Sequence, residues 1–399
     1  MAGSCFAGSQ NSFQPVVFDQ LFWVFSFYLL VSYIKTEKQQ YLILLAISLA
    51  LGFMTKYSIL FFIAAVFISI SIYKKEVFKA HVFWISVLLF LLLISPNLFW
   101  QWKHAFPVMA HFSRLYEVQL NKLTMADNLI ELIMSPNPFT LIVWITGILI
   151  APFVGFYKKF RLAFIVVLFS FVLLFLAKGK AYYFYPVILM SFITGSVVLE
   201  HFMVSKKWLL NSYITLLILM IPLASTIGIP ILPAKKYIQI FHIKKNDAGV
   251  TPIMDSYSFS FVWEELNATV KKIFISLPEK EKTNCLIWGD TYSWASGINL
   301  YAETYNTPAA FSFHGTHYLW VPRFEKGITV IAINNSNTND VQNLLNFYRQ
   351  FFSEVELKQQ LFNQYTTDKT DYYLNVFLCR DLKYDSENMI KIMKHRIFE

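Results

Sequence analysis

The sequence predicts a polytopic α-helical membrane domain followed by a C-terminal α/β domain. Mean hydropathy is +0.47, and hydrophobic residues make up 56% of the chain while charged residues make up 15%. Crossing a hydrocarbon core takes roughly 17 to 25 apolar residues, and candidate runs, some of them shorter, recur as far as about residue 230. Beyond that point the hydropathy falls to that of a soluble domain. These observations define a membrane protein with a soluble C-terminal part.

Residues 1–15 are expected to form a short N-terminal segment, which carries no cleavable signal peptide because it lacks a basic start and an apolar core. Residues 16–233 are expected to form the membrane domain, with about eight transmembrane helices. The apolar runs are Val16–Ile34, Tyr41–Thr55, Ser58–Tyr73, His81–Ser95, Pro138–Phe156, Leu162–Ala177, Tyr185–His201 and Trp208–Gly228. Only Lys56 and Tyr57 separate the second run from the third, which leaves open a broken hairpin or one bent helix.

The loops between these runs differ in charge. Ten basic residues fall in one set of alternate loops: Lys35, Lys38, Lys74, Lys75, Lys79, Lys158, Lys159, Arg161, Lys206 and Lys207. Six fall in the other set: Lys56, Lys103, Arg114, Lys122, Lys178 and Lys180. The positive-inside rule therefore places the first set in the cytoplasm and residues 234–399 outside.

The chain's net charge of +9 lies entirely in residues 1–233, because residues 234–399 carry 18 basic and 18 acidic residues. We therefore expect a lipid bilayer as partner and no nucleic acid. The three cysteines, Cys5, Cys285 and Cys379, have no metal-binding spacing, and pairing of the last two stays open. We expect neither a metal nor a cofactor.

Residues 96–137 form a long outer connection of mixed polarity, rich in aromatic residues, which is typical of a segment lying along the membrane surface. Within it, "MADNLIELI" has the apolar spacing of a short interfacial helix.

Residues 234–399 are expected to form an extracytoplasmic α/β domain. Phe261–Leu277 has one apolar helical face, while "CLIWG", "AAFSF", "ITVIAI" and "YYLNVFLC" are typical of strands. "NDVQNLLNFYRQFF" is expected as a helix between the last two strands. This alternation favours a small α/β domain, and no catalytic motif stands out in it.

Three outer lysines, Lys56, Lys178 and Lys180, lie at the ends of apolar runs, against the topological bias. They could extend to the lipid headgroups, with nearby aromatics forming an interfacial belt. Their convergence on one face favours an anionic ligand instead. Asp19, at the outer end of the first run, is either a functional carboxylate or a helix cap.

Several stretches together resemble the family 39 type of membrane glycosyltransferase, which includes dolichyl-phosphate-mannose protein mannosyltransferases and bacterial aminoarabinose transferases of lipid A. They are "QPVVFDQLFW", "LALGFMTKYSILFF", "SPNLFWQWKHAFP", "KGKAYYFYPVILM" and "WGDTYSWASGINLYAETYNTPAAFSFHGTHYLW". The resemblance runs from about Phe13 to about Pro322. It implies a GT-C class membrane domain with an extracytoplasmic active site and a sugar donor carried on polyprenyl phosphate.

The resemblance implies roles for the residues at the outer mouth. Lys56, Lys178 and Lys180 would hold the donor phosphate, because cations at a partly dehydrated membrane edge bind a phosphate strongly. Contacts to sugar or lipid are expected from Tyr57, Asn97, Gln101, His104, Tyr182, Tyr183 and Tyr185. The stretch containing Asn97, Gln101 and His104 could also be a purely structural re-entry turn.

The sequence departs from the family at its start. The family's first extracytoplasmic loop carries an acidic residue thought to be the catalytic base, and "MAGSCFAGSQNSF" does not resemble it. The chain therefore looks like a partial GT-C domain lacking N-terminal helices, with Asp19 as the remaining candidate base.

The predicted function is transfer of a sugar from a polyprenyl-phosphate carrier to a lipid, protein or cell-wall acceptor at the outer face of a bacterial inner membrane, by a truncated form of the enzyme. A transporter or flippase of lipid-linked sugars is the alternative from another class. A third interpretation is a non-catalytic remnant or a subunit of such an enzyme.

Overall fold

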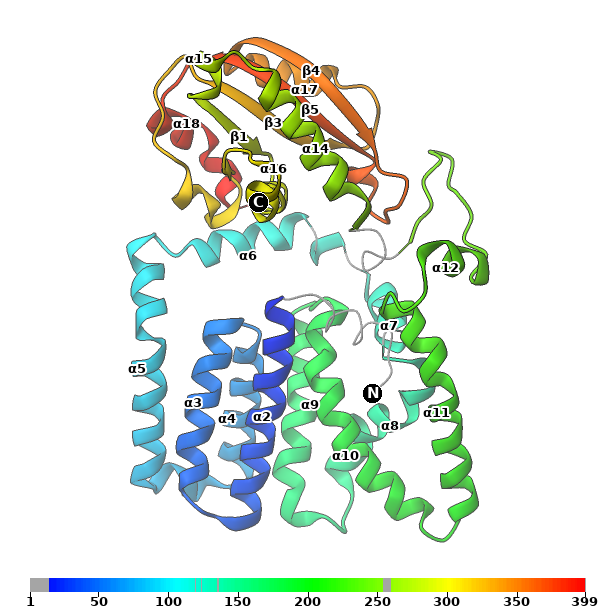
Figure 1. Cartoon of the computed structure of the whole chain (residues 1–399). Coiled ribbons are helices and arrows are strands. Elements are labelled where there is room, and N and C mark those ends of the chain that lie inside the picture. The colour runs from blue at the N-terminus through cyan, green and yellow to red at the C-terminus, as the bar shows by residue number, and fades with distance from the viewer. Residues whose placement is uncertain (1–13, 119, 123, 135, 254–259, 399) are drawn as a thin grey trace. The chain divides into compact units, whose positions relative to one another are not determined.

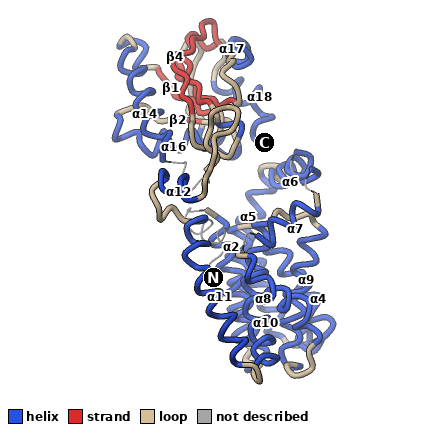
Figure 2. The backbone as a smooth tube through the Cα atoms, turned by 90° about the vertical axis from the view of Figure 1, so that its right-hand side faces the viewer, coloured by secondary structure: helices blue, strands red, loops and turns tan. Residues whose placement is uncertain are grey.

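The computed structural model describes residues 14–118, 120–122, 124–134, 136–253 and 260–398. The chain divides into an N-terminal unit that ends at Ile231 and a C-terminal unit that begins at Leu232. Helices build the N-terminal unit, whereas the described strands all lie in the C-terminal unit (Figure 2). The mostly helical unit followed by a small mixed sheet domain confirms the predicted fold class.

The longer helices of the N-terminal unit lie side by side (Figure 1). They are α2 (Pro15–Thr36), α3 (Gln40–Thr55), α4 (Ile59–Tyr73), α5 (His81–Lys103), α9 (Arg161–Leu176), α10 (Tyr185–Met203) and α11 (Lys207–Gly228). Helix α6 (Pro107–Val118) follows α5 at a sharp turn, and α7 (Met125–Met134) precedes the next long segment. The second and third apolar runs are thus two helices, α3 and α4.

Within the described residues, four helices are long and apolar enough to cross a membrane: Pro15–Thr36, His81–Lys103, Lys158–Leu176 and Ala181–Met203. Two segments bent at 91° to each other, Asn128–Met134 and Pro138–Phe153, would make a fifth span if counted as one. Three apolar helices are shorter: Gln40–Thr55, Ile59–Tyr73 and Lys207–Pro222. The total of about eight crossings stays a prediction.

Helix α5 continues through Pro96 to Lys103, whereas the sequence placed its end at Ser95. Proline has no N–H to donate to the carbonyl four residues before it, which is that of Leu92. The hydroxyl of Ser95 donates to this carbonyl at 2.8 Å, so the freed acceptor is satisfied inside the helix. As a result the first residues of the expected outer connection are helical.

The apolar run at 138–156 differs most from its predicted form. Instead of one helix it contains η3 (Pro138–Thr140), α8 (Leu141–Ile145), the π-helical turn η4 (Thr146–Ile150) and η5 (Ala151–Phe153). Helix α8 and the turn η4 pack closely against α10, because a Cβ added at Gly195 would collide with the carbonyl oxygen of Val143 on α8 and lie 2.9 Å from the nitrogen of Gly147 on η4. Small residues at this contact let two backbones approach, which is a common device between membrane helices.

A five-stranded sheet forms the centre of the C-terminal unit, in the order β2-β1-β3-β5-β4. Its strands are β1 (Cys285–Gly289), β2 (Ala310–Phe311), β3 (Thr329–Ser336), β4 (Phe352–Phe362) and β5 (Tyr373–Leu382). Strand β1 pairs in parallel with β2 and β3, whereas β5 is antiparallel to β3 and β4.

Helices cover both faces of this sheet. On one face the predicted amphipathic helix α14 (Ser260–Ser276) and α16 (Tyr292–Tyr305) pack on the sheet through residues such as Leu266 and Ile298. On the other face α17 (Gln342–Arg349) and α18 (Ser386–Ile392) pack through Tyr348 and Met389. The described part of the unit also contains the short helices α12 (Ala234–Ile240) and α15 (Glu279–Lys282).

The buried thiols of Cys285 and Cys379 are both free. They lie on β1 and β5, which are separated in the sheet by β3. Burial raises the pKa of Cys285 to about 12 and also raises that of Cys379, so both thiols stay protonated at neutral pH.

Candidate functional site

The carboxylate of Asp19 ties the start of α2 to the start of α4. Asp19 is 1% exposed, and the hydroxyl of Ser58 donates to its two oxygens at 2.8 and 2.9 Å. The indole nitrogen of Trp23, one turn further along α2, donates to Oδ1 at 3.0 Å. Because the N-cap of α2 is Gln14, Asp19 does not cap its own helix. Its carboxylate instead fixes the residues just after the break at Lys56.

Lys56 supplies a buried cation beside this carboxylate. Its backbone is extended, which ends α3, and its Nζ lies 4.5 Å and 4.2 Å from the ring centroids of Tyr182 and Tyr183. Among the described residues this nitrogen is buried and has no hydrogen-bond partner. Burial lowers the pKa of Lys56 to about 8; the negative charge of Asp19 raises it, and the positive charge of Lys180 lowers it further.

The second lysine of "KGK", Lys180, therefore acts on the same site as Lys56. Burial lowers the pKa of Lys180, and the negative charge of Glu131 on α7 opposes that effect. The Nζ of Lys178 lies 6.0 Å from the ring centroid of Tyr116 on α6. The electrostatic interactions thus link Lys56 with Lys180.

The turn that carries these lysines is held by a residue that sequence reasoning missed. Asn128 on α7 is 7% exposed, and its side-chain nitrogen donates to the carbonyl of Gly179 at 2.7 Å. Gly179 packs closely, because a Cβ there would lie 3.2 Å from the carbonyl oxygen of Leu174. In the sequence, the only indication of this contact is a polar residue, Asn128, within the apolar repeat of "MADNLIELI".

Three of the predicted contact residues form a second cluster. The hydroxyl of Tyr57 donates to Asn97 at 2.8 Å and accepts from the side-chain nitrogen of Gln101 at 3.0 Å. The side-chain oxygen of Gln101 accepts from the backbone N–H of Val108 at 3.3 Å. Through these bonds the turn after α3 is linked to α5 and to the start of α6.

His104 and Tyr185 lie outside both clusters. The ring of His104 stacks on Trp100 at 4.3 Å, and its Nδ1 lies 2.8 Å from the carbonyl oxygen of Trp100, one turn earlier. Tyr185 is 4% exposed at the start of α10, within the core of the N-terminal unit. The ring of Tyr185 is therefore less accessible to a sugar than those of His104, Tyr182 and Tyr183, which are half-buried.

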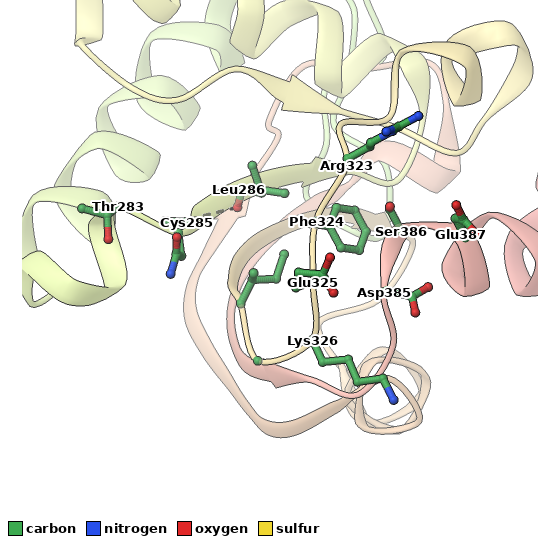
Figure 3. Close-up of a pocket in the computed structure, with 13 residues that line it drawn as sticks. Thr283, Cys285, Leu286, Arg323, Phe324, Glu325, Lys326, Asp385, Ser386 and Glu387 are labelled. Carbon is green, nitrogen blue, oxygen red and sulfur yellow. Dashed lines mark hydrogen bonds between the residues drawn. The ribbon is translucent and has the colours of Figure 1, made fainter.

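The C-terminal unit contains a polar cavity of about 770 Å³. It is lined by the start of β1, the loop before β3 and the start of α18, including Arg323, Lys326 and Asp385 (Figure 3). Cys285 is the only thiol in its lining, and its raised pKa makes it a poor nucleophile. Asp385 is engaged in capping α18, where it accepts from the N–H of Asn388 at 2.9 Å. The lining also contains Ser386, and among the described residues no hydrogen bond joins its hydroxyl to a base.

No group of three or more histidine, cysteine or acidic residues that could hold a metal ion is found within the described residues. The predicted residues around Lys56 are the candidate site considered below, and ammonium groups and tyrosine hydroxyls are groups that can bind an anion.

Residues 4–100 match the family model of the dolichyl-phosphate-mannose-protein mannosyltransferases. The matched part covers about a quarter of the chain and contains Asp19, Lys56, Tyr57, Ser58 and Asn97. Over these residues it confirms the resemblance to the family 39 type of membrane glycosyltransferase and supports, in general terms, a glycosyltransferase that uses a polyprenyl-phosphate sugar. With its apolar helices, the match also marks the chain as an integral membrane protein. No curated protein and no solved structure matches the chain.

Proposed function

We propose that this protein transfers a sugar from a polyprenyl-phosphate carrier to a lipid, protein or cell-wall acceptor at the extracytoplasmic face of a bacterial inner membrane. The observation that carries this proposal is the buried ammonium of Lys56, which has no hydrogen-bond partner within the described residues. Burying an ammonium without an acceptor is unfavourable, so such a group is retained where a ligand supplies the acceptor. The family match over this segment supports a lipid-linked phosphate as the ligand in this proposal.

In this proposal Lys56 and Lys180 bind the donor phosphate together, and Lys178 is at most an outer contact. The phosphate gains negative charge as the bond to the sugar breaks. Two fixed cations therefore stabilise the transition state more than the ground state. Tyr182 and Tyr183 hold the ammonium of Lys56 through their ring faces, at 4.5 and 4.2 Å.

Asp19 acts as a positioning residue in this proposal rather than as the catalytic base, and the departing polyprenyl phosphate takes up the proton of the acceptor hydroxyl. Its oxygens already accept bonds from Ser58 and Trp23. A base has to accept the proton of the acceptor hydroxyl, which needs a carboxylate oxygen within about 3.2 Å of that hydroxyl. The carboxylate of Asp19 instead fixes the turn that presents Lys56 and favours the charged form of its amine.

Reconstitution separates transfer from transport. The full chain is placed in vesicles with radiolabelled polyprenyl-phosphate mannose and an extract of bacterial envelope as the source of acceptor. We expect label to move from the carrier to the acceptor fraction and unlabelled polyprenyl phosphate to inhibit this movement. If instead the intact donor passes between leaflets with the sugar still on its carrier, the proposal is wrong and the protein is a transporter of lipid-linked sugars.

A further inference from the structure

A small polar cavity lies at the end of the N-terminal unit opposite to Lys56. Asp19 lies in the first turns of α2 and Ser58 is the N-cap of α4, while the two helices end beside Glu37 and Lys74. With a rise of 1.5 Å per residue, Asp19 and Glu37 are separated by about 27 Å along α2. The cavity, of about 200 Å³, is formed by these two helix ends and by the start of α9.

The lining of this cavity is strongly basic. Four of its side chains are cationic, namely Lys74, Lys158, Lys159 and Arg161, and Glu37 is its one acid. Lys74 pairs with Glu37 at 2.8 Å, and its hydrogen bond and charge lower the pKa of that carboxyl. The described lining therefore keeps a charge of about +3 at neutral pH.

The start of α9 increases this positive potential. A helix N-terminus carries a partial positive charge, which an acidic residue in the first turn often balances. The first turn of α9 contains no acidic residue, and Lys158 and Lys159 precede it, so this charge adds to that of the cavity. Within the described residues, the Nε of Arg161 is buried and has no hydrogen-bond partner. Such a donor at the edge of a cationic cavity indicates an acceptor that comes from outside the chain.

The cavity also has a defined shape. The Nζ of Lys159 donates to the carbonyl of Lys35, in the last turn of α2, at 3.0 Å. The Nζ of Lys74 lies 5.1 Å from the ring centroid of Tyr33 as well as bonding to Glu37. Two of the four cations are thus fixed by other elements, and Lys158 and Arg161 remain to face a ligand.

We propose that this cavity binds the phosphate of an anionic phospholipid headgroup. Helix ends of a membrane protein lie at the depth of the headgroups, so the bilayer itself presents phosphate there at high local concentration. Free phosphate has the same chemistry, but a lipid is also held by its chains against exposed apolar residues nearby, such as Ile72 and Phe156. This site does not depend on the proposed transferase function.

The test uses the full chain in phosphatidylcholine nanodiscs with and without phosphatidylglycerol. Native mass spectrometry then counts the phosphatidylglycerol molecules that stay bound after release from the disc. A Lys158→Gln/Arg161→Gln variant is compared with a matched control, Lys206→Gln/Lys207→Gln, which removes two exposed lysines that follow α10 at the same end.

We expect the cavity variant to bind phosphatidylglycerol about tenfold to thirtyfold more weakly and the control to bind it normally. Glu37→Gln should strengthen binding, because it removes the one acid of the lining; this gain keeps the test decisive if the double variant fails to fold. Equal losses of bound phosphatidylglycerol in the cavity variant and the control would overturn the proposal. They would show that basic residues attract anionic lipid generally, without a specific site in the cavity. Stabilisation by inorganic phosphate alone, with no preference for phosphatidylglycerol, would overturn the assignment to a lipid.

Discussion

At the scale of single residues, the ammonium of Lys56 is buried, which is rare for a lysine whose nitrogen has no hydrogen-bond partner among the described residues. Lys56 is flanked by two tyrosine rings and the carboxylate of Asp19, and its Nζ is withdrawn from solvent. The sequence could identify Lys56 because it lies at a helix end against the charge bias. The bonds from Ser58 to Asp19 could not be predicted, since they join residues 39 positions apart through the packing of α2 on α4.

The lowered pKa of Lys56 gives a pH dependence. An amine is charged below its pKa, so Lys56 should lose its charge as the pH rises through about 8. We expect the affinity for polyprenyl phosphate to fall about tenfold between about pH 7 and about pH 9.5, a range in which the phosphate stays doubly charged. In Asp19→Asn the loss of a neighbouring negative charge should lower the pKa of Lys56 further and move the decline to lower pH. The measurement is the affinity for polyprenyl phosphate as a function of pH, for the native chain and for Asp19→Asn. If the two pH profiles coincide, Asp19 does not raise the pKa of Lys56.

At the scale of elements, the candidate site is positioned by breaks between helices rather than by the lengths of the helices. The turn between α3 and α4 presents Lys56, the turn after α9 presents Lys180, and η4 allows α10 to approach closely. Helices themselves were predictable from apolar runs. The segment 138–156 was not, because its apolar composition is compatible with one straight helix, whereas in the structure it is broken where η4 packs on α10.

The contact between η4 and α10 can be tested by adding one methyl group. In Gly195→Ala the new Cβ would meet the carbonyl of Val143, so the two segments have to move apart. We expect destabilisation by about 1 to 3 kcal/mol, seen as a midpoint of thermal unfolding in detergent lower by roughly 2 to 10 °C. Gly155→Ala is the control, because no heavy atom lies within 4 Å of a Cβ there. Equal midpoints for both variants would show that the close approach does not stabilise the fold.

The C-terminal sheet shows a second limit of sequence reasoning. Strands β1, β3 and β5 were recognisable as continuous apolar runs because they are buried on both faces. Strand β4 was missed, since it lies at the edge of the sheet and its residues, "FSEVELKQQLF", are largely polar. Charged edge strands of this kind are usual, because they oppose pairing with another chain.

At the scale of the whole molecule, charge and hydropathy separate the two units. Residues 1–233 carry the chain's positive excess and its apolar helices, while residues 234–399 are balanced in charge. We infer that the C-terminal unit lies outside the cytoplasm and that Lys56 faces the same side. This orientation rests on the distribution of basic residues among the loops.

Cysteine labelling in intact cells tests the orientation. In a Cys5→Ser background the native Cys285 and Cys379 are buried and should stay unlabelled. A cysteine replacing Asn337, in the C-terminal unit, should react with an impermeant thiol reagent. One replacing Lys159 should react only after the cells are opened. The reverse pattern would place both the C-terminal unit and the candidate site in the cytoplasm.

The central claim is that the ammonium of Lys56 binds the phosphate of the carrier lipid. It is tested most directly by measuring the dissociation constant of polyprenyl phosphate for the full chain in nanodiscs, with the native residue and with Lys56→Gln. We expect the variant to bind about tenfold to a thousandfold more weakly, as for the loss of one electrostatic contact of about 1.4 to 4 kcal/mol. Lys103→Gln, at the exposed end of α5, should bind as the native chain does. Unchanged affinity in Lys56→Gln, with the fold intact, would contradict the account.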